Sequence, residues 1–342
     1  MASRKTVWTS LSLIVVLAVA GAILAARSTL TWLHSPIAAL TQSQSYEIPK
    51  GTSFSALARD LGARGLIESP QRLIVWARLT GQGKNLKAGE YELLPETTPQ
   101  GLIDLFVSGR VLLHSITFIE GSTFEEMRQT LARHPDVKQE LGKAAPSEIM
   151  RRLGAPDRHP EGLFFPDTYR FPKQTSDLEL MRMAYERMQR ELDVAWASRV
   201  PDLPLASAYE ALILASIIEK ETARETERGK ISGVFIERLR RQMRLQTDPT
   251  VIYGLDDSYD GNLRRADLQR DTPYNTYTRA GLPPTPIALP GLGALQAAVH
   301  PEETGALFFV ATGLGDGSHF FSRTLAEHDA AVARYLQRLR QQ

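Results

Sequence analysis

The sequence predicts an α+β protein with a single transmembrane helix at the N-terminus, a small α+β module and a larger, mixed α+β domain. Three observations support this prediction. An uncharged, mostly apolar run covers residues 7–26. Short strand-like and helix-like segments then alternate over residues 45–112. From residue 161 onward, clusters rich in Pro, Gly, Tyr and Thr alternate with strongly helical segments.

Length and composition fit a globular chain of about two domains. The chain has 342 residues, of which 43% are hydrophobic and 23% are charged. Forty Lys and Arg against thirty-nine Asp and Glu leave a net charge of +1, which excludes a general polyanion binder and an acidic disordered tail. The chain has no cysteine, so disulfides, thiolate nucleophiles, zinc fingers and iron–sulfur clusters are excluded.

The first element, the uncharged run at residues 7–26, is predicted to cross a membrane once. Twenty helical residues extend about 30 Å, which is the thickness of the hydrocarbon core of a bilayer. Arg4 and Lys5 precede the run, whereas only Arg27 follows it closely. By the positive-inside rule, this asymmetry leaves the N-terminus in the cytoplasm and places the rest of the chain on the other side.

The alternative for this run is a cleaved signal peptide, since residues 18–20 and 20–22 resemble cleavage sites. Both sites lie deep inside the run, which is longer than the apolar core of a usual signal peptide. We therefore predict a cytoplasmic N-terminus at residues 1–6, a retained helix at 7–27 and a juxtamembrane connector at 28–44. The protein is then expected to be a single-pass protein of the inner (cytoplasmic) membrane, with a periplasmic body.

The second element is a small module, residues 45–112, that begins with a short strand at 46–48. A helix follows over residues 54–61, because apolar residues recur there at positions i, i+3, i+4 and i+7. The residues expected to delimit this helix are the N-cap Thr52 or Ser53 and the terminators Gly62 and Gly65. The other elements expected in the module are a helix at 70–79, a strand at 89–94 and a helix near 99–108.

The opening of this module, residues 48–58, resembles the start of a LysM glycan-binding module. The alternative is a generic capped helix that follows a strand. A weaker copy of the same pattern, with a glycine turn, a hydroxyl cap and a helix that starts with Phe, occurs at residues 118–124. We therefore describe residues 113–160 as a connecting region with a second LysM-like half-repeat.

The larger domain, residues 161–342, contains a helix that carries the candidate catalytic group. Ser207 and Glu210 have capping-box spacing at its start, and the segment 211–218 has no charge and a single hydroxyl. Such a helix is buried on nearly all sides, so a carboxyl group at its end would lie at a cavity wall with a raised pKa. The alternative is that residues 219–221 simply emerge into solvent.

Only one of the two glutamates at this helix end can line a cleft. Residues two apart on a helix point about 200° apart, so Glu219 and Glu221 cannot act together as the paired carboxylates of a hydrolytic glycosidase. Glu219 has the small neighbours Ala215 and Ser216 on its face, whereas Glu221 has two isoleucines. This difference mildly favours Glu219.

Three clusters in the same domain combine aromatic rings with amide, hydroxyl and carboxylate groups. They cover residues 161–169, 245–254 and 271–284. A sugar polymer is bound by flat ring faces together with hydrogen-bonding groups for its hydroxyl and N-acetyl substituents. Each cluster alone is more often a capped turn, but three clusters beside one helix-end glutamate favour a sugar-binding site.

Longer motifs in these segments resemble the endolytic murein transglycosylase family (MltG, or YceG-like). The motifs are residues 215–222, 245–254, 273–277 with 281–284, 161–169 and 317–322. The resemblance covers essentially the whole chain, including the anchor and the LysM-like module. It implies a catalytic domain at residues 161–342 and a catalytic role for Glu219, the first Glu of the Glu-Lys-Glu-Thr stretch. One departure is Leu289, where many members carry a polar residue, and it affects only a local loop contact.

The resemblance implies a lytic transglycosylase, a carbon–oxygen lyase, that cleaves the MurNAc–GlcNAc β-1,4 bond within glycan strands and limits the length of nascent strands. One carboxyl group is enough, because the C6 hydroxyl of the substrate attacks C1 and forms a 1,6-anhydroMurNAc end. No metal or cofactor is required. The candidates for sugar binding are Ser216, Gln246, Asp248, Tyr274, Asn275 and Tyr277.

The expected partners are peptidoglycan glycan strands and the inner membrane. Peptidoglycan synthases (penicillin-binding proteins) are further expected partners, and nucleic acid is not. The rival function is a non-catalytic, membrane-anchored scaffold that binds peptidoglycan and recruits these synthases. Detection of anhydro-ended muropeptides distinguishes the two functions.

Overall fold

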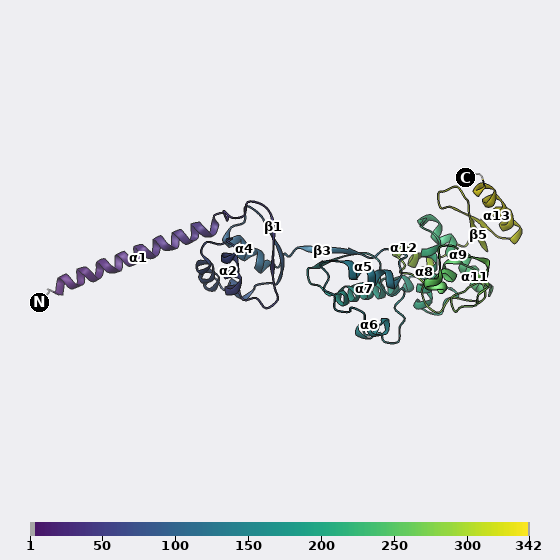
Figure 1. The fold of residues 1–342 in the computed structure, drawn as a ribbon, viewed down its shortest axis with the longest axis horizontal. Helices are drawn as coiled ribbons and strands as arrows, with labels where there is room; N and C mark the ends of the chain where they lie inside the picture. Colours follow the sequence, from purple (N-terminus) through teal and green to yellow (C-terminus); the bar gives the residue numbers. More distant parts are fainter. Residues whose placement is uncertain (1–3, 341–342) are drawn as a thin grey trace. The chain divides into compact units, whose positions relative to one another are not determined.

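The computed structural model describes residues 4–340 as helices and short strands in two compact units (Figure 1). The first unit contains the chain up to His114 and the segment Phe171–Lys173. The second unit contains Ser115–Arg170 and the chain from Gln174 onward. This mixture of helix and sheet agrees with the predicted α+β class. Residues 1–3 of the predicted cytoplasmic N-terminus lie outside the described residues.

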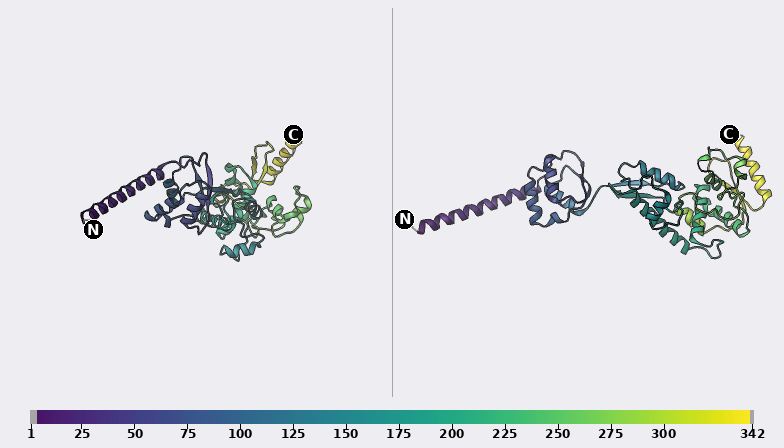
Figure 2. Two further views of the ribbon diagram at one scale, coloured as in Figure 1. Left: turned by 60° about the vertical axis from the view of Figure 1, so that its left-hand side comes forward. Right: turned by 60° about the horizontal axis from the view of Figure 1, so that its bottom comes forward.

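One long helix, α1 (Arg4–His34), contains the predicted membrane span (Figure 2). Its segment Leu13–His34 has 22 residues and a mean hydropathy of 2.2, so it is long and apolar enough to cross a bilayer. The helix does not end at Arg27, because the first residues of the predicted connector continue it to His34. Leu33 is fully buried. The end of α1 is therefore packed into the first unit rather than forming a free connector.

Two antiparallel strands and three helices form the body of the first unit. Strand β1 (Gln44–Ile48) pairs with β2 (Gly89–Leu93), which places Tyr46 opposite Tyr91. The helical elements are α2 (Phe54–Ala63), α3 (Pro70–Leu79), the short 3-10 turn η1 (Gln82–Lys84) and α4 (Pro99–Ser108). Their buried residues form one core with the segment that follows α1, including Ile37, Leu40, Leu57, Leu61, Leu73 and Phe106.

Helix α2 extends past the residue that was predicted to end it. Ser53 is the N-cap, and its side chain accepts a hydrogen bond from the Ala56 N–H at 3.2 Å. The helix continues through Gly62 and ends at Ala63. A side chain at position 62 would come within 2.3 Å of Pro70 Cγ, so this glycine allows the start of α3 to pack closely. Helices α3 and α4 have the predicted bounds.

The division between the two units passes through a short two-stranded sheet, and the first half of the second unit also contains three helices. The sheet pairs β3 (Leu113–Thr117) with β4 (Thr168–Pro172). The helices are α5 (Phe124–Arg133), α6 (Pro146–Arg152) and α7 (Asp177–Ala197). Thr123 caps the start of α5, as the hydroxyl-capped pattern at residues 118–124 predicts, and Glu126 completes a capping box.

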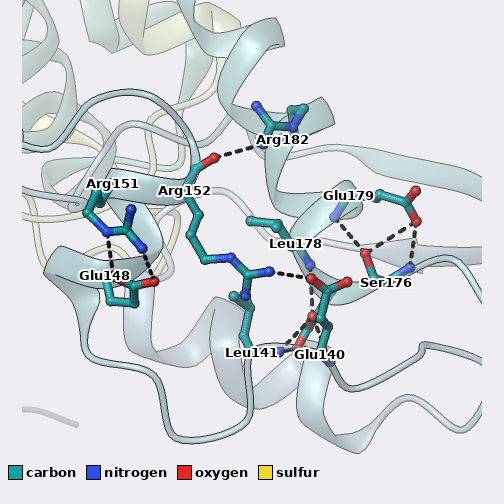
Figure 3. A network of polar contacts seen from close by, with 10 residues as sticks. Glu140, Leu141, Glu148, Arg151, Arg152, Ser176, Leu178, Glu179 and Arg182 are labelled. Atoms are coloured by element: carbon teal, nitrogen blue, oxygen red, sulfur yellow. Dashed lines mark hydrogen bonds and ion pairs between the residues drawn. The ribbon is translucent and has the colours of Figure 1, made fainter.

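A network of polar contacts holds α6 and the preceding loop against the start of α7 (Figure 3). The Asp177 carboxylate accepts the Leu141 N–H at 3.1 Å. Arg152 of α6 pairs with Glu140, and its own carbonyl accepts a hydrogen bond from Arg182 of α7 at 2.8 Å. The middle of the loop is therefore held by an ion pair at Glu140 and a backbone hydrogen bond at Leu141.

The second half of this unit is built around α8 (Ala208–Glu221). Helices α9 (Glu225–Arg240) and α12 (Leu292–Val299) both pack against it. Beyond them, α13 (Leu325–Leu339) lies beside the hairpin of β5 (Phe308–Ala311) and β6 (His319–Ser322), as Figure 1 also shows. The remaining short elements are α10 (Asp248–Leu255), the 3-10 turn η2 (Asp256–Ser258) and α11 (Arg265–Gln269).

Candidate active site

The end of α8 places two glutamates in different surroundings. Ser207 caps the start of the helix by accepting the Glu210 N–H at 3.3 Å, as its spacing predicts. The capping box is not closed, because the Glu210 side chain accepts the Ala206 N–H instead. All eight residues from Ala211 to Ile218 are buried, which anchors the helix in the core. The helix ends at Glu221, since Thr222 adopts an extended conformation. Glu219 and Glu221 therefore lie on the last turn of a helix whose preceding residues are fixed in the core.

Glu219 lies between a backbone N–H and an arginine. Its Oε2 accepts a hydrogen bond from the Gly291 N–H at 2.9 Å, and its Oε1 accepts one from Arg228 Nη2 at 3.2 Å. The Glu219 side chain is only 6% exposed. Burial raises the pKa of Glu219, while the Gly291 N–H and the Arg228 charge act in the opposite direction. A carboxyl group held in this balance can both give and accept a proton.

Two chain segments approach closely to complete these surroundings. The Gly121 N–H donates to Leu289 O, and the Leu289 N–H donates to Ser122 O, each at 2.8 Å. A Cβ at Gly291 would come within 1.9 Å of Glu120 Oε1, so a side chain there would displace the end of the Glu120 side chain. The glycine turn around Gly121 thus lies beside Glu219. Leu289, the departure from the family pattern, is fully buried in this pairing.

Arg228 and Glu120 are functional candidates that the sequence reasoning missed. Arg228 Nη2 lies 3.8 Å from Glu120 Oε2 as well as 3.2 Å from Glu219 Oε1, so it bridges two carboxylates. Nothing in the local pattern of α9 distinguishes Arg228 from the other arginines of that helix.

Glu221, unlike Glu219, lines a cavity of about 460 Å³. Thr247 Oγ1 donates a hydrogen bond to Glu221 Oε1. Burial raises the pKa of Glu221 to about 7, against the lowering effect of the Thr247 bond. The residues that line the cavity are Glu221, Arg238, Leu245, Gln246, Thr247, Asp248, Tyr277, Phe308, Phe309, Val310, Leu325 and His328.

Three of the six predicted sugar-binding residues meet in this cavity, on the side of Glu221 rather than Glu219. They are Gln246, Asp248 and Tyr277. The Tyr277 hydroxyl donates to Asp248 Oδ1 at 2.6 Å, and Arg238 Nη1 lies 3.4 Å from Gln246 Oε1. The combination of a carboxylate, an amide, a phenol and two phenylalanine rings suits a sugar ring with its hydroxyl and acetamido groups.

The other three predicted sugar-binding residues are placed elsewhere. Ser216 is fully buried, donates to Ile213 O at 2.7 Å and accepts the Ile287 N–H at 3.0 Å. Asn275 is also fully buried, and its side-chain amide donates to loop carbonyls such as Arg270 O at 2.7 Å. These two side chains hold the fold because no face of either reaches solvent. The Tyr274 hydroxyl forms a hydrogen bond with Thr285 Oγ1 at 2.9 Å.

A third buried carboxyl group, Glu161, lies in the aromatic cluster around Tyr274. It is 4% exposed and accepts hydrogen bonds from the Phe124 N–H at 3.0 Å and the Tyr253 hydroxyl at 3.2 Å. Burial raises the pKa of Glu161 from 4.5 to about 7 despite these bonds. The Glu161 carboxyl group therefore links the start of α5 to α10 through hydrogen bonds, and its pKa lies in the neutral range.

Glu161→Gln is expected to flatten the pH dependence of stability. A carboxyl group whose pKa is raised in the folded state stabilises the fold at low pH, and this stabilisation is lost as the pH rises from about 4.5 to about 7. Glutamine does not titrate, so the fall in the free energy of unfolding over this range should shrink by about 1–3 kcal/mol. Urea unfolding at several pH values measures the change.

Glu303→Gln, at a side chain that is 80% exposed, is the control and should leave the pH dependence of stability unchanged. Parallel curves for Glu161→Gln and the unmodified protein would contradict the assignment.

Comparisons with known proteins agree on one family. Residues 46–334 match the model of the YceG-like family. The chain is 32% identical to the endolytic murein transglycosylase of Bacillus subtilis, with 84% of each chain covered. It is 27% identical to that of Streptococcus pneumoniae, covering 84% of this chain and 58% of the relative.

A solved structure supports the same relationship. The crystal structure of a yceG-like protein from Listeria monocytogenes matches with a TM-score of 0.52 and 28% sequence identity. The match covers 84% of this chain and 99% of that one. With a family match over most of the sequence, and a fold shared with a solved relative, the chain belongs to the YceG-like family.

Proposed function

We propose that this protein is an endolytic lytic transglycosylase of peptidoglycan. It cleaves the MurNAc–GlcNAc β-1,4 bond within glycan strands, leaves a 1,6-anhydroMurNAc end and limits the length of nascent strands. The observation that carries the proposal is the buried Glu219, held by Arg228 and the Gly291 N–H, in a chain whose relatives are named endolytic murein transglycosylases.

Glu219 performs both proton transfers of this reaction. The protonated carboxyl first gives its proton to the glycosidic oxygen, so the C1–O bond breaks and the GlcNAc side leaves with a hydroxyl. The carboxylate then removes the proton of the C6 hydroxyl while that oxygen bonds to C1. The attack is intramolecular, so neither a second carboxyl group nor an activated water is needed. Arg228 and the Gly291 N–H keep the carboxylate oriented between the two steps.

The cavity beside Glu221 binds another part of the glycan strand. Gln246, Asp248 and Tyr277 supply hydrogen bonds, and Phe308 and Phe309 supply flat apolar faces. An endolytic enzyme must hold sugars on both sides of the bond that it cuts. The Glu221 cavity, at the same helix end as Glu219, provides a place for the sugars on one side of that bond.

The proposal is tested by incubating the full chain in detergent with purified sacculi. Mass analysis of the released fragments should find anhydro-ended muropeptides, each lighter by one water than a hydrolysis product. Products of intermediate length would show that the cuts are internal. If the protein binds sacculi but releases no anhydro product, the scaffold function would replace the enzyme.

The domain assignment follows from the same proposal. Residues 7–27 form the transmembrane helix of a single-pass inner-membrane protein, residues 45–112 a LysM-like module that binds glycan, and residues 161–342 the catalytic domain in the periplasm. The β1–α2 order with its Ser53 cap supports the LysM-like description. Peptidoglycan synthases are the protein partners that this location favours.

Deletion of residues 1–27 is expected to give a soluble protein that still cleaves isolated glycan strands. The groups proposed for catalysis all lie in the second unit, and the buried end of α1, including Leu33, is retained. Turnover on soluble strands should stay within about twofold, which corresponds to about 0.4 kcal/mol in activation free energy, because no catalytic group is removed. Activity assays and circular dichroism on the truncated protein check this. A folded but inactive truncation would contradict an independent second unit.

A further inference from the structure

We propose that the outer face of α3 lies in the lipid headgroup region of the membrane that α1 crosses. The first unit would then rest on the bilayer surface beside its own anchor. The partner is therefore a lipid surface, and the contact is separate from glycan cleavage.

Helix α3 has two apolar faces, of which only one is used by the fold. Leu73, Ile74 and Ala77 are buried in the core of the first unit. Val75 and Leu79, on another face, are 54% and 78% exposed. A helix on the surface of a soluble domain normally has a single apolar stripe. A second exposed stripe indicates an interaction with something apolar.

This second face continues the surface of α1. A cavity of about 560 Å³ runs between the two helices, and both belong to the first unit. Ala25, Ala26 and Leu30 line it from α1, and Val75 and Leu79 line it from α3. The relative position of the helices is fixed, because the end of α1 and the residues after it enter the core of the unit. The apolar face is therefore level with the end of the predicted membrane span.

The depth of this face matches the headgroup layer. If residues 7–26 fill the hydrocarbon core, Leu30 lies about 6 Å beyond it, at a rise of about 1.5 Å per residue. The headgroup layer on each side of the core is about 5–8 Å thick. Val75 and Leu79 share the cavity with Leu30, so they fall within this layer.

The polar residues of α3 also suit this position. The helix contains Arg72, Trp76 and Arg78 and has no acidic residue. Tryptophan and arginine are favoured at the boundary between lipid and water, and arginine is attracted to anionic headgroups. Trp76 keeps its indole N–H satisfied by donating to Gln100 at 2.7 Å, so its ring can contact lipid without an unpaired donor.

Single-cysteine labelling tests the proposal, because the natural chain has no cysteine. The full chain carries Val75→Cys or Leu79→Cys with a nitroxide label, in vesicles of phosphatidylethanolamine and phosphatidylglycerol. Leu113→Cys is the matched control, since Leu113 is 56% exposed in the same unit. The ratio of collisions with oxygen, which concentrates in lipid, to collisions with a water-soluble nickel complex should be several-fold higher at positions 75 and 79 than at 113.

Two outcomes would overturn the proposal. Equal ratios at the three positions would place the α3 face in water. Protection of positions 75 and 79 from both reagents would show that protein, either a partner or a second copy of the chain, covers the face instead of lipid. Both test positions are solvent-exposed in the fold, so circular dichroism of the labelled proteins should match that of the unmodified chain.

Discussion

Glu219→Gln is expected to abolish formation of anhydro-ended muropeptides while the protein stays folded and still binds glycan. Glutamine keeps the size of the side chain and can still accept the Gly291 N–H, but it cannot give or take the catalytic proton. General acid–base catalysis contributes roughly 10²–10⁴-fold, and a group that serves both proton transfers should lie at the upper end. Product release from sacculi, measured by mass, and a pull-down with sacculi separate catalysis from binding.

Glu221→Gln is the matched control, two residues along the same helix. Glutamine can still accept the hydrogen bond of the Thr247 hydroxyl, so the fold of the cavity should survive. The loss of activity should be much smaller than for Glu219→Gln. An inactive Glu221→Gln beside an active Glu219→Gln would move the proton transfer to the cavity of Gln246 and Asp248. If both variants stay active, this helix end is not the active site.

Arg228→Gln should slow the reaction and move its pH dependence. Arg228 holds Glu219 Oε1 at 3.2 Å, and loss of positioning at a reacting group costs up to about 10²-fold in rate. Its positive charge lowers the pKa of Glu219. Without this charge the pKa of Glu219 rises, so the protonated acid persists to higher pH and the basic limb of the activity profile should move upward. The profile of kcat against pH measures both effects.

Two further variants keep this prediction specific. Arg228→Lys retains the charge and should leave the basic limb near its original pH, with a smaller loss of rate. Arg240→Gln removes an arginine that is 35% exposed from the same helix, and should change neither rate nor profile. A slow Arg228→Gln enzyme with an unshifted profile would limit Arg228 to a structural role.

Local patterns in the sequence were sufficient to predict the helices and strands of the first unit, the cap of α5 and helix α8. The apolar run, the helices that start at Pro70 and Pro99, and the caps Ser53 and Ser207 agree with the structure. Each depends on the spacing of apolar residues or on a cap within one or two turns, so neighbours along the chain contain the information. The discrepancies, at Gly62 and at the end of α1, occur where a distant residue packs against the element.

Part of the candidate site could also be predicted from neighbouring residues along the chain. The uncharged helix, and the divergence of Glu219 and Glu221 at its end, follow from the local sequence and from helical geometry. The sequence by itself therefore determined the apolar N-terminal helix, the elements of the first unit and the restriction of the candidate catalytic group to Glu219 or Glu221. The family motifs favoured Glu219.

Only the tertiary structure decided which groups surround each glutamate. Gly291 is 72 residues from Glu219, and it reaches the carboxylate because α12 packs on α8. The cavity at Glu221 is lined instead by Gln246, Asp248 and Tyr277. The side chains of Ser216 and Asn275 are buried and form hydrogen bonds within the fold. The physical reason is that hydrogen bonding and desolvation act over a few ångströms in space. The spacing of residues along the chain does not contain those distances.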